Sequence, residues 1–380
     1  MKLGQLVSGI TIALISCVEP YEPKINDEVF DILVVDGYIN TTDRSAKVRL
    51  SRAVPVDQVM PPSSEDNATV LVEDEGGTTY ALYNSGQGVY VADELGLDES
   101  KKYRLHVFTS ADEEYVSEYV NLNSSPPIDS LVWRPDDDDI SIYVNTHDPD
   151  ANSHYYEWTY EETWEYNSSF ISTYKIVDGI AYPRTFDEQI YTCWSTEAST
   201  KILVGTSERL SSDVISNFPI TSIPGESSKL SRRYSIQVQQ RVVSKEEFDF
   251  KKQLERTTES LGGLFDAMPS AVIGNMRSTN PNSTYPVLGY FSGGGVSKQR
   301  IFIDFYDLPN EILAIPRPPL CTEDNDINVI PVADVATTTD LLIYPIFSQS
   351  ANAIIAYSAA SRRCVDCTVS GGTTKRPDFW

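Results

Sequence analysis

The stretch ATVLVEDEGGTTYALY, residues 68–83, indicates how the first part of the chain folds. Apolar side chains alternate with polar ones on both sides of Gly76-Gly77, and a period of two is typical of strands with one buried face. Two glycines between such segments favour a tight turn, because glycine adopts positive φ without steric cost. The stretch therefore predicts a β-hairpin.

Short segments of the same kind lie on both sides of this hairpin. They are DILVVDGYI (31–39), AKVRLS (46–51), GVYVA (88–92) and KYRLHVF (102–108). About six such strands between residues 29 and 125 predict an antiparallel β-sandwich of immunoglobulin-like or transthyretin-like type. Pro126-Pro127 favours a domain boundary at residue 125, because proline cannot continue a hydrogen-bonded ladder.

Residues 126–380 predict a second β-rich module. Alternating patterns occur in DISIYVN (139–145), YYEWTYEE (155–162), YSIQVQQRVV (234–243), YPVLGYF (285–291), QRIFIDF (299–305) and LLIYPIF (341–347). The first of these resemble the start of a fibronectin-like sandwich, and the less regular region 165–230 is expected to be an insertion. The fold class is therefore mainly β, with two tandem sandwich modules.

One substantial helix is predicted in the second module, at about residues 245–262. Ser244 and Glu247 have the spacing of a capping box. The apolar side chains that recur at helical spacing, and are expected to face the core, are Phe250, Leu254, Leu261 and Leu264. Gly262-Gly263 favours the end of the helix there.

The N-terminal segment has the pattern of an export signal. Residues 1–16, MKLGQLVSGITIALIS, join Lys2 to an apolar run that is too short to span a bilayer. Leu14-Ile15-Ser16-Cys17 resembles a bacterial lipobox, which implies cleavage before Cys17 and anchoring in outer-membrane lipid through its acyl chains. The acidic, proline-rich residues 17–28 are predicted to be a tether, and they resemble the surface-export signal of Bacteroidota lipoproteins.

Four further cysteines remain: Cys193, Cys321, Cys364 and Cys367. An even number in an exported chain predicts two disulfides, for which three pairings exist. We favour bonds from Cys193 and Cys321 to one member each of the Cys364/Cys367 pair, which would staple the C-terminal tail to the second module. A bond within that pair and a zinc site are the alternatives.

The charge and the motifs limit the classes of function. A net charge of −25, from 30 basic and 55 acidic residues, should repel nucleic acids and excludes them as expected partners. No HExxH, GxSxG, Walker or GxGxxG motif occurs, so we expect no catalytic residue, metal or cofactor. The glycine-rich FSGGGVS (291–297) lacks the lysine of a phosphate loop and is predicted to be a tight turn or bulge between two strands.

Several longer stretches carry a family resemblance. They are CVEPYEP (17–23), LVVDGYINTTDRSAKVRLSRAVPV (33–56), ATVLVEDEGG (68–77), PPIDSLVW (126–133), SLGGLFDAMPSAVIGNM (260–276), YPVLGYFSGGGVSKQRIFI (285–303) and CVDCTVSGGTTKRPDFW (364–380). Together they resemble the Bacteroidota lipoproteins grouped as domain of unknown function 4249. The resemblance implies an outer-membrane lipoprotein, commonly encoded near TonB-dependent receptors, and supplies no reaction or catalytic residue.

The function expected from these observations is that of a non-catalytic, surface-exposed lipoprotein. It would be an accessory binding partner of a TonB-dependent β-barrel receptor in nutrient uptake. The alternatives are a structural or assembly subunit of an outer-membrane complex, a surface hydrolase, and a glycan-binding protein that uses exposed aromatic residues. The aromatic candidates for glycan binding are Trp133, Trp158, Trp164 and Trp194.

Overall fold

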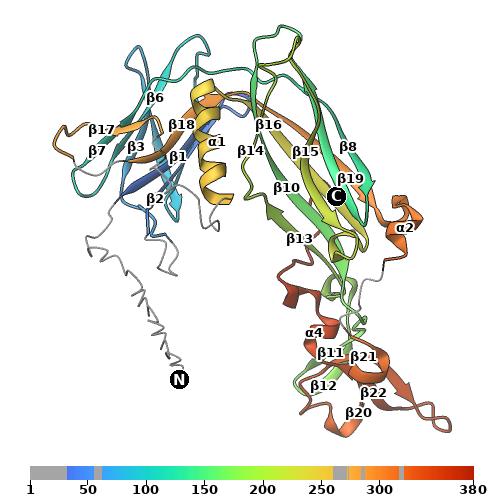
Figure 1. Ribbon diagram of the computed structural model, residues 1–380. Helices are drawn as coiled ribbons and strands as arrows, with labels where there is room; N and C mark the ends of the chain where they lie inside the picture. Colours follow the sequence, from blue (N-terminus) through green and yellow to red (C-terminus); the bar gives the residue numbers. More distant parts are fainter. Residues whose placement is uncertain (1–31, 55–61, 260–271, 273, 284–286, 316–320) are drawn as a thin grey trace, which may run out of the picture.

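The computed structural model describes residues 32–54, 62–259, 272, 274–283, 287–315 and 321–380. Within these ranges the protein is mainly β, as predicted, and has three parts (Figure 1). We call them the N-terminal sheet, the central sandwich and the distal lobe. Helix α1 (Lys245–Glu259) lies between the first two parts. Among the described residues, no helix is both long and apolar enough to cross a bilayer.

The N-terminal sheet has nine strands in the order β17-β7-β6-β3-β4-β5-β2-β1-β18. Seven are consecutive: β1 (Leu33–Asn40), β2 (Ser45–Arg52), β3 (Thr69–Asp74), β4 (Thr79–Gly86), β5 (Val89–Ala92), β6 (Tyr103–Phe108) and β7 (Glu114–Ser117). The other two, β17 (Met276–Ser278) and β18 (Leu288–Gly294), come from much later in the chain. Residues 29–125 therefore do not build this sheet alone, and the predicted division at residue 125 does not follow the sheets.

The predicted hairpin at residues 68–83 is formed by β3 and β4. Val70 and Val72 are buried in the apolar core, as their alternation requires. The Asp74 carboxylate accepts hydrogen bonds from the backbone N–H groups of Gly76 and Thr78, at 2.8 and 2.9 Å. Gly77 has a φ of +85°, so the turn uses the left-handed region that glycine permits.

The central sandwich consists of two sheets that face one another. One has the order β15-β9-β8, and the other has β13-β10-β16-β19 with β14 paired to β10. The bounds are β8 (Ile128–Asp136), β9 (Asp139–His147), β10 (Tyr155–Asn167), β13 (Thr192–Ala198), β14 (Leu203–Thr206), β15 (Val214–Pro224), β16 (Arg233–Val242) and β19 (Val296–Asp304). Large side chains from both sheets, Trp158, Tyr156, Ile140 and Tyr234 among them, fill the space between the sheets and are fully buried.

Helix α1 begins after Ser244, whose hydroxyl accepts the Glu247 N–H at 3.1 Å, as the predicted cap requires. The Glu247 side chain, however, lies 3.1 Å from Arg241 and also accepts a hydrogen bond from Ser292. Phe248 is buried, and the Phe250 ring packs against Tyr290 of β18 at 5.3 Å. Leu254 is half-buried, and Gly262, Gly263, Leu261 and Leu264 lie outside the described residues.

The distal lobe is built from two segments of the chain. One lies within residues 165–230, which the sequence predicts to be an insertion, and the other lies within residues 323–365. Its elements are β11 (Tyr174–Val177), β12 (Ile180–Pro183), α3 (Glu323–Asp326), β20 (Ile327–Pro331), β21 (Leu341–Phe347), β22 (Ile354–Ala360) and α4 (Arg362–Val365). Strand β10 leads into the lobe and β13 leads back to the sandwich (Figure 1). Short helical turns complete the structure: η1 (Phe186–Glu188), η2 (Ser228–Leu230), η3 (Phe305–Asp307), α2 (Asn310–Leu313), η4 (Val332–Asp334) and η5 (Cys367–Ser370).

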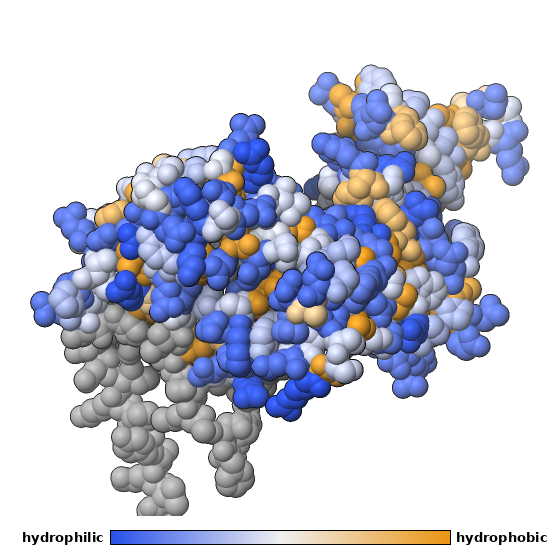
Figure 2. All heavy atoms as spheres, turned by 90° about the horizontal axis from the view of Figure 1, so that it is seen from above, coloured by the Kyte–Doolittle hydropathy of each residue, from blue (hydrophilic) through white to orange (hydrophobic). Residues whose placement is uncertain are grey.

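The surface of the protein is predominantly hydrophilic on the face shown in Figure 2. This agrees with the net charge of −25. Residues 1–31, which include the predicted signal, Cys17 and the tether, lie outside the described residues. Lipidation of Cys17 therefore stays a prediction.

Candidate binding cleft

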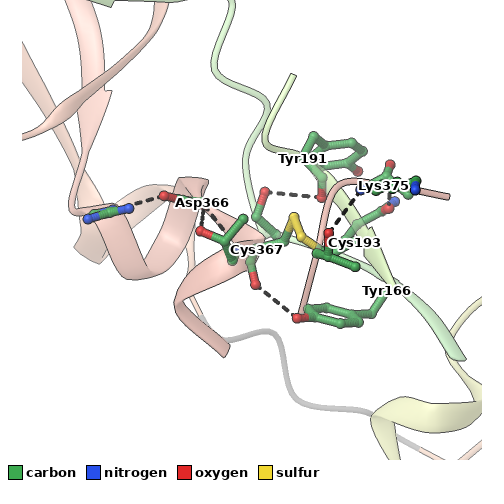
Figure 3. The surroundings of a disulfide bond; sticks show 12 residues. Tyr166, Tyr191, Cys193, Asp366, Cys367 and Lys375 are labelled. Atoms are coloured by element: carbon green, nitrogen blue, oxygen red, sulfur yellow. Dashed lines mark hydrogen bonds and ion pairs between the residues drawn. A yellow bond between two sulfur atoms is a disulfide. The ribbon is translucent and has the colours of Figure 1, made fainter. Parts of the chain in front are cut away.

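Two disulfides hold the C-terminal tail and the distal lobe. Cys193 of β13 is bonded to Cys367 (Figure 3), and Cys321 is bonded to Cys364, with Cα–Cα distances of 5.8 and 5.6 Å. Each member of the Cys364/Cys367 pair thus has a distant partner, which is the pairing favoured above. Cys321, Cys364 and Asp326 lie close together, but both sulfurs are used in the disulfide and so do not offer thiolate ligands to zinc.

The tail that follows Cys367 is fixed to the edge of the central sandwich. The Tyr166 hydroxyl donates to the Cys367 carbonyl at 2.9 Å (Figure 3). Trp194 and Thr373 exchange two backbone hydrogen bonds of 2.9 Å, so the tail pairs with the edge strand β13. Hydrogen bonds from Thr368 and Arg362 outweigh the effect of burial and lower the pKa of Asp366.

A cleft of about 860 Å³ opens where the central sandwich, the distal lobe and the tail meet. Its lining joins segments that are far apart in the sequence. They are Glu165, Ile171, Phe186, Asp187, Gln189, Tyr191, Thr192, Trp194, Arg233, Thr374, Lys375, Arg376 and Trp380. The volume lies within the range of about 300–1,000 Å³ that is usual for small-molecule sites.

Four of the thirteen residues that line this cleft are aromatic. Phe186 in the turn η1 is 90% exposed, which is unusual for a phenylalanine. Trp194 and Tyr191 are half-buried and come from β13 and the segment before it. The Trp380 indole packs edge-on against Phe302 at 5.7 Å and donates from Nε1 to the Glu165 carboxylate at 3.1 Å.

The charges in the cleft are mostly satisfied by partners within the protein. Arg232 donates to the other Glu165 oxygen at 2.7 Å, so both oxygens of that carboxylate are engaged. Arg233 forms two hydrogen bonds with Asp304, which raise the pKa of its guanidinium group. In the described part of the chain, the side chains of Asp187, Gln189 and Lys375 have no such partner. The cleft therefore presents one free acid, one free amine and one free amide.

The model of the family described as domain of unknown function DUF4249 matches residues 18–300. The chain belongs to the DUF4249 family. The match includes all nine strands of the N-terminal sheet and most of the central sandwich, and it ends within β19. In this DUF4249 protein, the tail residues that line the cleft lie beyond the matched range: Thr374, Lys375, Arg376 and Trp380.

Two solved structures with distant similarity come from Bacteroides species. A DUF3823 family protein from Bacteroides ovatus is 10% identical and covers 56% of this chain and 90% of its own, with a TM-score of 0.15. A protein from Bacteroides uniformis, provisionally described as carbohydrate binding, is 8% identical and covers 57% and 91%, also with a TM-score of 0.15. Similarity at this level identifies neither a shared ligand nor a shared site. No curated protein matches the chain.

The four tryptophans considered for glycan binding have different environments in this DUF4249 protein. Trp158 and Trp164 are buried in the central sandwich, and the half-buried Trp133 packs against the same core. Only Trp194, of these four, lines the cleft. Phe186, Tyr191 and Trp380 were not predicted. A tail that ends in two aromatic residues was the one visible signal for them, because local patterns do not reveal which distant segments meet.

A second polar site joins the central sandwich to the N-terminal sheet. The Glu157 carboxylate of β10 accepts hydrogen bonds from Arg241 of β16 and from Lys251 of α1. Arg241 also donates to Ser292 of β18 at 3.0 Å and lies over the Tyr38 ring at 4.3 Å. Burial would raise the pKa of Glu157, but the two cations outweigh it and lower that pKa. Burial raises the pKa of Tyr38 to about 12.

Proposed function

We propose that this protein is a non-catalytic binding lipoprotein of the outer membrane. It is anchored through acylated Cys17, faces the cell exterior, and serves a TonB-dependent β-barrel receptor in nutrient uptake. The observation that carries the binding role is the open aromatic cleft of about 860 Å³ between the central sandwich, the distal lobe and the tail. An exposed aromatic surface in a fixed frame is suited to hold a ligand.

The chemistry of the cleft supports binding rather than hydrolysis. Glycoside hydrolysis commonly requires two carboxyl groups that flank the scissile bond, one of which donates or accepts a proton. The cleft has two acids, and both oxygens of Glu165 are already engaged by Arg232 and Trp380. Asp187 is then the one carboxylate among the described lining residues with no protein partner, so the pair lacks a second carboxyl group that is free to exchange a proton with a substrate.

Anchoring and orientation are supported by the sequence. A cleaved signal that ends at Cys17 would place two or three acyl chains at the start of the mature chain, and each buried methylene contributes about 0.8 kcal/mol to membrane binding. The acidic surface, with a net charge of −25, would not adhere to anionic head groups and would keep the folded parts in solvent. A tethered binding protein of this kind can deliver a ligand to a neighbouring receptor.

Gentle purification of the native protein from detergent-solubilised outer membranes tests the proposal. We expect a TonB-dependent barrel to co-purify in near-stoichiometric amount, and whole-cell protease treatment to cleave the lipoprotein. Cys17→Ala is the control, because it should release the protein from the membrane and abolish co-purification. Recovery of the wild-type lipoprotein alone would contradict the receptor partnership. Recovery with many surface proteins would favour an assembly subunit.

A further inference from the structure

We propose that the cleft binds a neutral oligosaccharide. This inference rests on the proposed role as a binding protein and names the ligand class of the same site. A sugar ring has one apolar face of C–H groups and a rim of hydroxyl groups. A matching site therefore needs exposed aromatic surfaces beside side chains that donate and accept hydrogen bonds.

The aromatic surface is present and is held in place. Phe186 lies in η1, where the Glu188 carboxylate accepts the Thr185 N–H at 3.0 Å and pairs with Lys175. These contacts fix the turn while the phenyl ring remains 90% exposed. An apolar ring kept in water by a fixed turn gains stabilisation from a ligand that covers it. Trp194 is likewise fixed, because its backbone is paired with Thr373.

The hydrogen-bonding groups are present beside these rings. Asp187 and Gln189 follow Phe186 in the sequence, and Lys375 reaches the cleft from the tail. As noted above, these side chains have no partner in the described part of the chain. A carboxylate accepts, an ammonium group donates, and an amide does both, so together they match hydroxyl groups, which also do both.

The charge balance favours a neutral ligand. Arg233 is neutralised by Asp304, and Arg376 donates to the backbone oxygen of Trp380. The charges of the described lining that no acid or base compensates are then Asp187, Lys375 and Arg376, because a backbone oxygen does not cancel a guanidinium charge, and they sum to one positive charge. An anionic ligand would gain from only this one net positive charge in the cleft and would be repelled by the protein as a whole, with its net charge of −25.

The backbone of the cleft disfavours a peptide. Extended peptides commonly bind by adding a strand to an exposed sheet edge. Strand β13 is such an edge, but its backbone at Trp194 already exchanges two hydrogen bonds with Thr373 of the tail. A peptide would have to displace the tail, whereas a sugar can bind through side chains alone.

The test measures binding to the full-length protein in detergent by calorimetry and by tryptophan fluorescence. The probes are neutral oligosaccharides of glucose, xylose, mannose and galactose, with oligogalacturonates and a casein digest as anionic and peptide comparators. We expect saturable binding of at least one neutral probe. Phe186→Ala should weaken it by about tenfold or more, because the ring loses both its contact area and its stacking. The matched variant Phe347→Ala removes a phenylalanine that is 52% exposed outside the cleft, and should leave the affinity unchanged.

Three results would overturn the inference. They are no neutral probe bound at millimolar concentration, equal affinity in Phe186→Ala, or binding confined to the oligogalacturonates or the peptides. Because Phe186 is exposed, its replacement should not affect folding, and a circular dichroism melt checks this. Barrel co-purification and sugar binding, both measured on the wild-type protein, separate the two proposals. A wild-type protein that retains the barrel and binds no sugar would refute the ligand class alone, whereas one that binds sugar without a barrel would refute the receptor partnership alone.

Discussion

The N-terminal sheet and the distal lobe are stabilised in different ways. Twenty buried hydrophobic residues form the described core of the N-terminal sheet, with contributions from β17 and β18. The two described apolar clusters of the distal lobe contain five and four buried residues. The lobe instead has covalent bonds, with Cys321 joined to Cys364 and Cys367 joined to the sandwich at Cys193.

The difference follows from the size of the two parts. A small unit buries too little apolar surface to offset the loss of conformational entropy on folding. A disulfide reduces the entropy of the unfolded chain and therefore substitutes for part of the missing core. The N-terminal sheet needs no such bond, but it depends on strands supplied from residues 276–294. One part should therefore be sensitive to core mutations and the other to reduction.

The largest effect is expected from Phe291→Ala in the N-terminal sheet. Phe291 is fully buried, and it lies on β18 opposite Gly37, where an added Cβ would come within 2.9 Å of the Phe291 ring. Truncation to alanine leaves a cavity, and should lower the free energy of unfolding of this sheet by about 4 kcal/mol. Urea denaturation followed by hydrogen exchange measures the loss.

Phe108→Ala is the matched control, because Phe108 lies in β6 of the same sheet and is 38% exposed. It should cost at most about 1 kcal/mol. The distal lobe should keep its exchange protection in both variants. Equal losses in the two variants, or loss of protection in the lobe, would remove the contrast between the two parts.

Removal of the disulfide within the distal lobe is expected to have the next largest effect. The double variant Cys321→Ala/Cys364→Ala opens a loop with a sequence separation of 43 residues, and should lower the stability of the lobe by about 3 kcal/mol. Limited proteolysis should then cleave near β20 to β22 while the N-terminal sheet stays intact. Treatment of the wild-type protein with reductant should give these fragments too, with further cleavage in the tail where Cys193–Cys367 is also opened. Unchanged proteolysis under both conditions would show that the small apolar clusters are sufficient.

Much of the fold could be predicted because its signals are local. The hairpin at residues 68–83, the helix after Ser244 and most strands follow from alternation, caps and glycines close together in the sequence. The partner of a strand is not a local property. The alternation in YPVLGYF predicted the strand that is β18, but it did not indicate that this strand pairs in parallel with β1, about 250 residues earlier. The glycine-rich FSGGGVS proved to lie where the chain passes from β18 in one sheet to β19 in another.

The cleft could be predicted only in fragments. Trp194 was considered as one of four exposed aromatic candidates. The predicted disulfide from Cys193 to Cys364 or Cys367 also indicated that the tail lies near Cys193. Phe186 gave no signal, because a single phenylalanine in an irregular segment is more commonly a core residue. Its exposure depends on the turn that Glu188 and Lys175 hold, and such contacts become visible only in the folded chain.

The charged contact between the N-terminal sheet and the central sandwich gives the third prediction. Glu157→Gln removes the charge that faces Arg241 and Lys251, and hydrogen bonds to charged groups stabilise by about 2 kcal/mol. We expect the N-terminal sheet and the central sandwich to unfold less cooperatively, so that their urea transitions separate. Glu161→Gln on the same strand is the control, since the Glu161 side chain is 42% exposed and lies 3.7 Å from Arg300. Transitions that stay coincident in Glu157→Gln would mean that the charge cluster does not couple the two parts.

The smallest expected effect is a loss of stability at low pH, caused by protonation of Asp74 in the hairpin of the N-terminal sheet. A hydrogen bond from Lys101, with further ones from Thr78 and Gly76, lowers the pKa of Asp74 from 3.8 to about 2. Because the folded pKa lies below the unfolded one, the ionised form stabilises the fold. This contribution is complete above about pH 4 and is lost as the pH falls towards 2.

Melting temperatures of the wild type and of Asp74→Asn between pH 7 and pH 2 measure this contribution. We expect the wild type to melt a few degrees higher at neutral pH, and the two curves to converge below pH 4. Glu75→Gln, at an exposed position in the same turn, should follow the wild type throughout. A constant difference down to pH 2 would mean that the shape of the side chain, and not its charge, holds the turn. Acid would then no longer distinguish the N-terminal sheet from a lobe whose disulfides do not respond to pH in this range.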